Sequence, residues 1–206
     1  MGSKEYFNEV ASDWDKMQET FFSNKVREVA IQAANVQQGS IAADVGAGTG
    51  FITEELLKHK AKVIAIDQSV EMIEEMKKRF CCCGIDYRIG EAEKLPVENE
   101  KVDFVFANMY LHHVEDPPAA IKEMVRILRP GGKIVITDAD KHNYEFLRTE
   151  QHDRWLGFLR NDIIKWYKEA GLKNIKVDCV NTDCTPTSQQ SGERVAISIF
   201  YALGEK

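Results

Sequence analysis

The chain of 206 residues lacks any long apolar run, any excess of positive charge and any cysteine pattern typical of a metal site. No segment approaches the ~18 consecutive apolar residues that a membrane-spanning helix needs. Residues 1–20 are polar with scattered aromatic side chains, unlike a secretory signal. Acidic residues outnumber basic ones by 33 to 27, for a formal net charge of −6, which disfavours nucleic acid as a partner. We therefore expect a cytoplasmic protein, monomer or homodimer, that acts on a small molecule.

The five cysteines fall into two groups, Cys81-Cys82-Cys83 and the pair Cys179 and Cys184. Neither group has the C-x-x-C repeats or the Cys/His spacing of a zinc site. An odd number of cysteines in a cytosolic chain also argues against disulfides. We expect reduced thiols and no metal site.

The most informative motif is the glycine-rich stretch from Asp44 to Gly50, Asp-Val-Gly-Ala-Gly-Thr-Gly. It follows the apolar run 41–45 and precedes a segment with helical spacing, so the glycines lie where a strand passes into a helix and backbone can approach a ligand. A dinucleotide fingerprint, G-x-G-x-x-G, would place its third glycine at position 51, where this chain has Phe51. The motif therefore fits NAD and its pyrophosphate imperfectly.

Two acidic residues indicate a different nucleoside. Asp67 comes 17 residues after Gly50, at the tip of the next predicted strand, where a carboxylate can accept hydrogen bonds from a ribose diol. Asp44 places a second carboxylate near the ligand, which repels phosphate and suits an ammonium or sulfonium group. S-adenosylmethionine has an adenosine, an α-amino group and no phosphate. The alternative is a structural turn with an incidental acid.

Further motifs follow in order: Gly90-Glu91-Ala92-Glu93-Lys94-Leu95-Pro96, 103–108 (Asp-Phe-Val-Phe-Ala-Asn), 111–114 (Leu-His-His-Val) and 128–133 (Leu-Arg-Pro-Gly-Gly-Lys). Together with the glycine motif they resemble the class I S-adenosylmethionine-dependent methyltransferases of the small, single-domain kind, methyltransferase type 11, similar to ubiquinone and menaquinone methyltransferases. The likeness runs from about Tyr6 to the C-terminus. One departure is Glu91, where the family often has Asp.

The resemblance implies S-adenosylmethionine as cofactor, S-adenosylhomocysteine as product, and a set of contact residues. Ala92 and Glu93 are expected to contact the adenine, and Asn108 to lie beside the methionine portion. The complete set of expected cofactor contacts is Asp44, Gly46, Ala47, Gly48, Gly50, Asp67, Gln68, Met72, Ala92, Glu93, Asn108, Tyr6 and Trp14.

Alternation of short apolar runs with helical segments predicts an α/β fold, a Rossmann-like doubly wound sheet with helices on both faces. Strands are expected at 41–45, 62–66, 86–89, 102–107, 133–137, 175–180 and 195–202, and helices at 51–58, 70–80, 119–128 and 162–170. No helix separates the last two of the seven strands, so the sheet should be mostly parallel with an antiparallel last strand, as the resemblance also implies. One domain over 1–206 can bury a sufficient core.

Two aromatic-rich segments lie outside the nucleotide core. Residues 1–35 have helical spacing and are expected to form a lid over the cofactor, with Tyr6 or Trp14 near its methionine end. Residues 141–160 are expected to cover the acceptor site. The alternative is that these aromatic side chains simply pack the outer core.

Methyl transfer from a sulfonium is an in-line displacement, so the protein must mainly align acceptor and methyl group and exclude water. A base helps when the acceptor is a hydroxyl or a carbon acid. The candidates are His113 first and His112 second, just beyond the fourth strand, where open α/β sheets bind ligands. The alternative is a histidine that bonds to backbone and shapes the loop.

We expect methyl transfer to a small-molecule acceptor, and other functions stay open. A metalloid or thiol methyltransferase would use Cys179 and Cys184 as soft ligands, although three separated cysteines are usual for arsenite. A nicotinamide oxidoreductase would share the fold but should have the glycine spacing that Phe51 interrupts. A non-catalytic cofactor-binding regulatory module is the alternative from another class.

Overall fold

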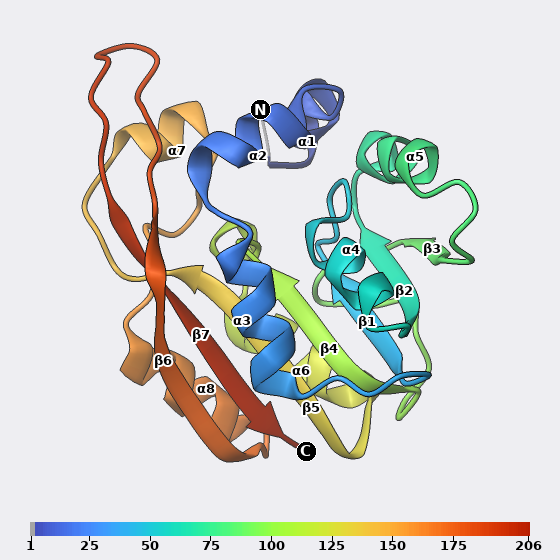
Figure 1. Cartoon of the computed structure of the whole chain (residues 1–206). Helices are drawn as coiled ribbons and strands as arrows, with labels where there is room; N and C mark the ends of the chain where they lie inside the picture. Colours follow the sequence, from blue (N-terminus) through green and yellow to red (C-terminus); the bar gives the residue numbers. More distant parts are fainter. Residues whose placement is uncertain (1–2) are drawn as a thin grey trace.

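The computed structural model describes residues 3–206 and is organised around a seven-stranded sheet (Figure 1). The order of the strands across the sheet is β3-β2-β1-β4-β5-β7-β6. The strands are β1 (Ile41–Val45), β2 (Lys62–Asp67), β3 (Asp86–Ile89), β4 (Val102–Asn108), β5 (Leu128–Ala139), β6 (Lys173–Cys184) and β7 (Ile197–Glu205). The helices are α1 (Ser3–Val10), α2 (Trp14–Phe21), α3 (Lys25–Ala34), α4 (Phe51–Lys58), α5 (Val70–Arg79), η1 (Leu111–His113, a 3₁₀ turn), α6 (Pro117–Ile127), α7 (Phe146–Glu150) and α8 (Arg160–Glu169).

The strand directions confirm the predicted doubly wound topology. Strands β3, β2, β1, β4 and β5 pair in parallel, while β7 is antiparallel to both of its neighbours, β5 and β6. The reversed last strand follows from the lack of a helix between β6 and β7. As a result, the carboxyl ends of the parallel strands meet at one edge of the sheet.

Side chains that alternate along the strands pack into two apolar layers, one on each face of the sheet. On β4, Phe104 and Phe106 pack with α3 and α4, while Val105 and Ala107 pack with α6 and α8. Figure 1 shows α3 and α4 in front of the sheet and α8 behind it. Strands buried on both faces read as continuous apolar runs, which is why β1, β2 and β4 were predictable from sequence.

Some element boundaries differ from the sequence prediction. Helix α6 begins at Pro117 rather than at residue 119, because the Asp116 side chain accepts a hydrogen bond from the N–H of Ala119 and proline is well tolerated in a first helical turn. Strand β5 begins at Leu128, where the chain was expected to be helical, since Leu128 already pairs with Val102 across an irregularity in the ladder.

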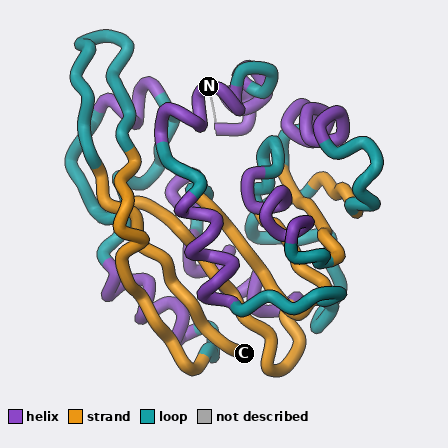
Figure 2. Tube along the Cα trace, viewed as in Figure 1, coloured by secondary structure: helices purple, strands orange, loops and turns teal. Residues whose placement is uncertain are grey.

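The N-terminal segment forms three helices where the sequence indicated one helical stretch. Figure 1 shows α1 and α2 together beyond the carboxyl ends of β4 and β5. Figure 2 shows that most of the chain between β5 and α8 is loop, interrupted by α7. No helix within residues 3–206 has both the length and the apolar character needed to cross a membrane.

Candidate active site

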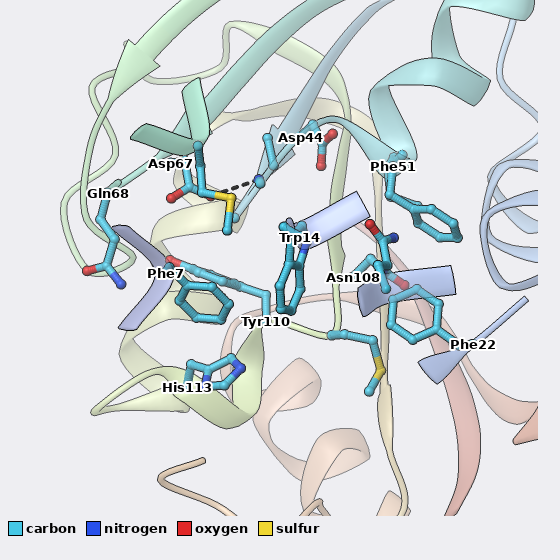
Figure 3. A pocket seen from close by; sticks show the side chains of 17 residues that line it. Phe7, Trp14, Phe22, Asp44, Phe51, Asp67, Gln68, Asn108, Tyr110 and His113 are labelled. Carbon is cyan, nitrogen blue, oxygen red and sulfur yellow. Dashed lines mark hydrogen bonds between the residues drawn. The ribbon is translucent and has the colours of Figure 1, made fainter. Parts of the chain in front are cut away.

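The glycine turn after β1 is held against β2 by its own backbone. The N–H groups of Gly46 and Ala47 both donate to the carbonyl of Ile66, at 2.9 and 3.0 Å, and the N–H of Gly48 donates to Oδ2 of Asp67 at 2.8 Å (Figure 3). Gly46 and Gly48 have φ values of 68° and 54°, a region that favours glycine. The turn therefore presents bare backbone beside the carboxylate predicted to bind a ribose.

Two carboxyl groups, the buried Asp44 and the partly buried Asp67, lie in the cavity above this turn. Asp44 accepts hydrogen bonds from the N–H and the hydroxyl of Thr53, at 3.0 and 2.7 Å, yet burial raises the pKa of Asp44 to about 7 and the charge of Asp67 adds to the rise. Burial also raises the pKa of Asp67, opposed by backbone N–H donors that include Ser69 and Gly48. A positive group between the two would relieve their repulsion, whereas a phosphate would increase it.

Most of the predicted cofactor contacts line this cavity, which has a volume of about 60 Å³. Those found there are Trp14, Asp44, Gly46, Ala47, Gly48, Asp67, Gln68, Met72 and Asn108. A cavity of that size holds only a few water molecules. A nucleoside can enter only if side chains at its wall move.

Tyr110 is the side chain that occupies the wall nearest the glycine turn. Its ring packs directly on Gly46, where any Cβ would overlap it. The ring also lines a neighbouring hollow together with Gln68 and the predicted adenine contacts Ala92 and Glu93. The expected contacts are thus divided between two adjoining hollows, with Tyr110 common to both. No sequence signal pointed to Tyr110.

Gly50 and Tyr6 do not line the cofactor cavity. Gly50 precedes α4 with a φ of 99°, and a Cβ there would meet the ring of Phe80, so close packing explains this glycine. Tyr6 lies in a second cavity, where its hydroxyl donates to Gln151 at 2.9 Å.

The second cavity, which we call the acceptor cavity, adjoins the first and also has a volume of about 60 Å³. Both are lined by Phe7, Trp14, Phe22, Met109 and His113. Figure 3 shows Phe7, Trp14 and His113 near one another in this shared wall. Further residues lining the acceptor cavity come from α1, from the segment between β5 and α8, and from the end of β6, among other elements. Both aromatic-rich segments therefore contribute to it.

His112 is held by a carboxylate at the end of the neighbouring strand. Its Nδ1 lies 2.7 Å from Oδ1 of the fully buried Asp138, and its backbone N–H donates to the same side chain. Burial lowers the pKa of His112, but the charges of Asp138 and Asp153 outweigh it and raise that pKa to about 9. Asp138 was missed from sequence, although an acid at the carboxyl end of β5 satisfies the rule that singled out the histidines.

His113 is neutral and lacks a hydrogen bond at one nitrogen. Burial and the positive charge of His112 hold its pKa well below the usual value, and Phe7 packs edge-on against its ring at 4.9 Å between centroids. Its Nδ1 is buried without a hydrogen-bond partner among residues 3–206. Asp153, from the loop after α7, faces both histidines; nothing in the sequence marked it.

The cysteines do not converge. Cys184 lines the acceptor cavity, where burial and then nearby acids raise its pKa to about 12, so the thiol stays protonated. Cys179 accepts from the N–H of Asn181 at 3.3 Å and does not line that cavity. Cys81, Cys82 and Cys83 are exposed. Within the described part of the chain, no group of three potential metal ligands includes a cysteine.

Comparison with known proteins gives one family. Residues 43–136 match the family model described as a methyltransferase domain. The ubiquinone biosynthesis O-methyltransferase of Coxiella burnetii (strain Dugway 5J108-111) is 30% identical over 190 residues, which cover 83% of this chain and 81% of that protein. The 2-methyl-6-phytyl-1,4-hydroquinone methyltransferase 1 of Oryza sativa subsp. japonica is 28% identical over 160 residues, covering 76% and 48%.

Solved structures share the fold. One chain of the complex between the Haloferax volcanii Trm112 methyltransferase activator and a methyltransferase matches with a TM-score of 0.81 at 17% identity, covering 99% of this chain and 97% of that one. Phosphoethanolamine N-methyltransferase 2 of Haemonchus contortus, in complex with phosphomonomethylethanolamine and S-adenosylhomocysteine, matches with a TM-score of 0.72 at 16% identity, covering 87% and 52%. The family model and the 30% identical Coxiella relative show that the chain belongs to the class I methyltransferases, whose cofactor is S-adenosylmethionine.

Proposed function

We propose that this protein transfers a methyl group to a small hydroxylated aromatic acceptor bound in the acceptor cavity. The observation that carries the proposal is the shared wall between two cavities. One cavity lies beside the carboxyl groups of Asp44 and Asp67, and the other is lined mainly by aromatic and aliphatic side chains. The named substrates of the Oryza relatives are hydroquinones, and the Coxiella relatives act in ubiquinone biosynthesis. Rings of this kind suit an apolar lining with a few polar groups, and the side chains around the acceptor cavity of about 60 Å³ would have to move apart to admit one.

The residues proposed to hold the cofactor are those of the glycine turn, Asp67, Gln68, Met72 and Asn108, with Ala92 and Glu93 at the adenine. When bound, S-adenosylmethionine supplies a methyl group on a positively charged sulfur. The residues of the chain orient this ligand and exclude water. Asp67 orients the ribose, Asp44 favours the positive end of the ligand, and the aromatic wall of Phe7, Trp14 and Phe22 excludes water.

The remaining sequence-based expectations are part of this proposal. Residues 1–206 form one catalytic unit, in which 1–35 act as the lid and 141–160 as the cover of the acceptor. We expect a cytoplasmic monomer or homodimer that does not bind nucleic acid. The two candidates for a base, His113 first and His112 second, line the acceptor cavity and are proposed to lie beside the hydroxyl of the acceptor.

The test is a screen of acceptors read out as S-adenosylhomocysteine release. The purified chain is incubated with S-adenosylmethionine and with catechols, hydroquinones, thiols, amines or arsenite in turn, and Gly48→Val serves as the variant expected not to bind cofactor. Turnover with catechols or hydroquinones supports the proposal. Cofactor binding without turnover of any acceptor would indicate a non-catalytic module, and turnover restricted to thiols or arsenite would contradict the proposed acceptor.

A further inference from the structure

Three polar side chains gather at the acceptor cavity without hydrogen-bonding to one another. Nε2 of His112 and Nδ1 of His113 lie 3.8 and 3.9 Å from the same oxygen, Oδ1 of Asp153. These distances are too long for hydrogen bonds. All three side chains are only 8% exposed, and one ligand atom from each lies within 4.8 Å of the others.

The unpartnered nitrogen of His113 is independent support for a missing ligand. Buried polar atoms in proteins are almost always hydrogen-bonded or bound to an ion, because leaving one bare is costly. Nδ1 of His113 is buried, faces Asp153 and has no hydrogen-bond partner in the described part of the chain. A ligand placed between His113 and Asp153 would satisfy it.

Asp138 prepares His112 for the same ligand. Its carboxylate can only accept, so the contact of 2.7 Å keeps a proton on Nδ1 of the imidazole. The metal ion would displace the other proton, from Nε2, which faces Asp153. Metal-binding histidines are typically fixed in this way, with a carboxylate on the ring nitrogen that does not bind the metal.

We propose that His112 Nε2, His113 Nδ1 and Asp153 Oδ1 form a binding site for a divalent transition-metal ion such as Zn²⁺. Two imidazoles and a carboxylate suit Zn²⁺, Co²⁺ or Fe²⁺ better than Mg²⁺ or Ca²⁺, which prefer oxygen ligands. Tetrahedral bonds of about 2.0–2.1 Å separate ligand atoms by about 3.4 Å. The separations to Asp153 are 3.8 and 3.9 Å, and all three ligand atoms lie within 4.8 Å of one another. The side chains must therefore move inward until these separations shorten by at most about 1.4 Å.

From the position of this metal site we infer that it helps to bind the acceptor. This role rests on the proposed function. His112, His113 and Asp153 all line the acceptor cavity, and His113 also lines the cofactor cavity. Three protein ligands leave a fourth coordination position open. A hydroxyl oxygen of the acceptor at that position would be held next to the shared wall, across which the methyl group must pass.

The experiment is a titration of the metal-free, full-length protein with Co²⁺ and Zn²⁺. Visible absorption reports the coordination of Co²⁺, and calorimetry gives stoichiometry and affinity. We expect one ion per chain and a tetrahedral or five-coordinate Co²⁺ spectrum. His113→Phe and Asp153→Asn, which keep much of each side chain's shape, should abolish that spectrum, and Asp138→Asn should weaken binding roughly 10–100-fold.

The matched control is His142→Gln. His142 lines the same cavity but is not part of the cluster, so this variant should bind Co²⁺ as the parent does. The inference is overturned if the parent binds no ion, or if His113→Phe and Asp153→Asn bind it equally well. Circular dichroism of each variant shows whether loss of the Co²⁺ spectrum is caused by unfolding. Two substitutions of different shape are used so that at least one variant should remain folded.

Failure of the metal site and failure of the proposed function give different results. If turnover of hydroxylated acceptors continues unchanged in chelator and the parent shows no Co²⁺ spectrum, the metal site is wrong and the proposed function stands. If Co²⁺ binds as expected but no hydroxylated acceptor is methylated, the metal site stands and the proposed acceptor is wrong.

Discussion

The carboxylate of Asp67 accepts a hydrogen bond from the backbone N–H of Gly48 at 2.8 Å, and a second from the N–H of Ser69 at 2.9 Å. One side chain at the tip of β2 thus shapes the glycine turn after β1 and also begins α5. The residue proposed to bind the ribose is therefore part of the scaffold as well.

Replacing Asp67 should affect both binding and stability. We expect Asp67→Ala to reduce the affinity for S-adenosylhomocysteine by roughly 1.5–3 kcal/mol, the range for hydrogen bonds to a charged group, and to lower the free energy of unfolding by about 1–3 kcal/mol because two N–H groups lose their acceptor. Calorimetry and urea unfolding measure the two effects. Asp86→Ala, an exposed acid on the adjacent strand, is the control. Unchanged affinity in Asp67→Ala would remove Asp67 from the cofactor site.

Gly48→Val should abolish cofactor binding. A side chain at a φ of 54° is strained, and its Cβ would point toward Trp14, whose Nε1 lies 3.6 Å from that position. Gly131→Val is a matched control, since Gly131 also has a positive φ, 76°, but faces open space away from the cavity. Calorimetry should show that Gly131→Val binds S-adenosylhomocysteine and that Gly48→Val does not. Normal binding by a folded Gly48→Val protein would show that the turn does not touch the cofactor.

Asp44 should release a proton when the cofactor binds. Its pKa is about 7 in the free protein, and a nearby ammonium or sulfonium would lower it. Affinity for S-adenosylmethionine should therefore rise with pH up to about 7 and then level off. Calorimetry in buffers of different ionisation enthalpy measures the proton directly, and Asp44→Asn should eliminate this buffer dependence. Equal proton release by the variant would assign the effect to another group.

In the protein without cofactor, the contribution of Asp44 to the free energy of unfolding should decrease with rising pH, whereas the affinity for cofactor should increase. The folded-state pKa of Asp44, about 7, exceeds the unfolded value, so the folded state binds more protons between these two values. The contribution of Asp44 to the free energy of unfolding therefore falls as the pH rises from about 4 to 7. Urea unfolding across this range should show a smaller decline for Asp44→Asn than for the parent.

The helices α1 and α2 should become better protected when cofactor binds. Phe7 and Trp14, 5.2 Å apart between ring centroids, come from these helices and form part of the wall between the cavities. We expect S-adenosylhomocysteine to slow amide exchange over 6–22 while leaving α8, on the far side of the sheet, unchanged. Slow exchange over 6–22 that does not respond to ligand would identify these helices as ordinary core packing rather than a lid.

The sequence predicted the sheet because its strands follow local patterns, and the same patterns bring most of the expected cofactor contacts together in one cavity. Apolar runs and glycine spacing located β1, β2 and β4, and most of the predicted contacts follow directly from the ends of these strands. Gly50 shows the limit of such reasoning, because a glycine required by the ring of Phe80 looks the same in sequence as one required by a ligand.

The polar cluster at the acceptor cavity could not be predicted in the same way. Asp153 faces His112 and His113 from a loop that lies 41 and 40 residues later in the chain, and no periodic pattern relates them. The role of Tyr110 could not be predicted from sequence either, because its contact with Gly46 joins the end of β4 to the turn after β1 through tertiary packing alone.

The ring of Tyr110 covers the face of Gly46 that we expect the cofactor to approach, so the two would compete for one surface. The free protein would then be an equilibrium between a form in which this ring covers the glycine turn and a form in which the ring has moved away, and only the second form would bind cofactor. The dissociation constant measured for cofactor equals the intrinsic constant divided by the competent fraction. A smaller residue at position 110 would therefore tighten binding, even though it adds no contact to the ligand.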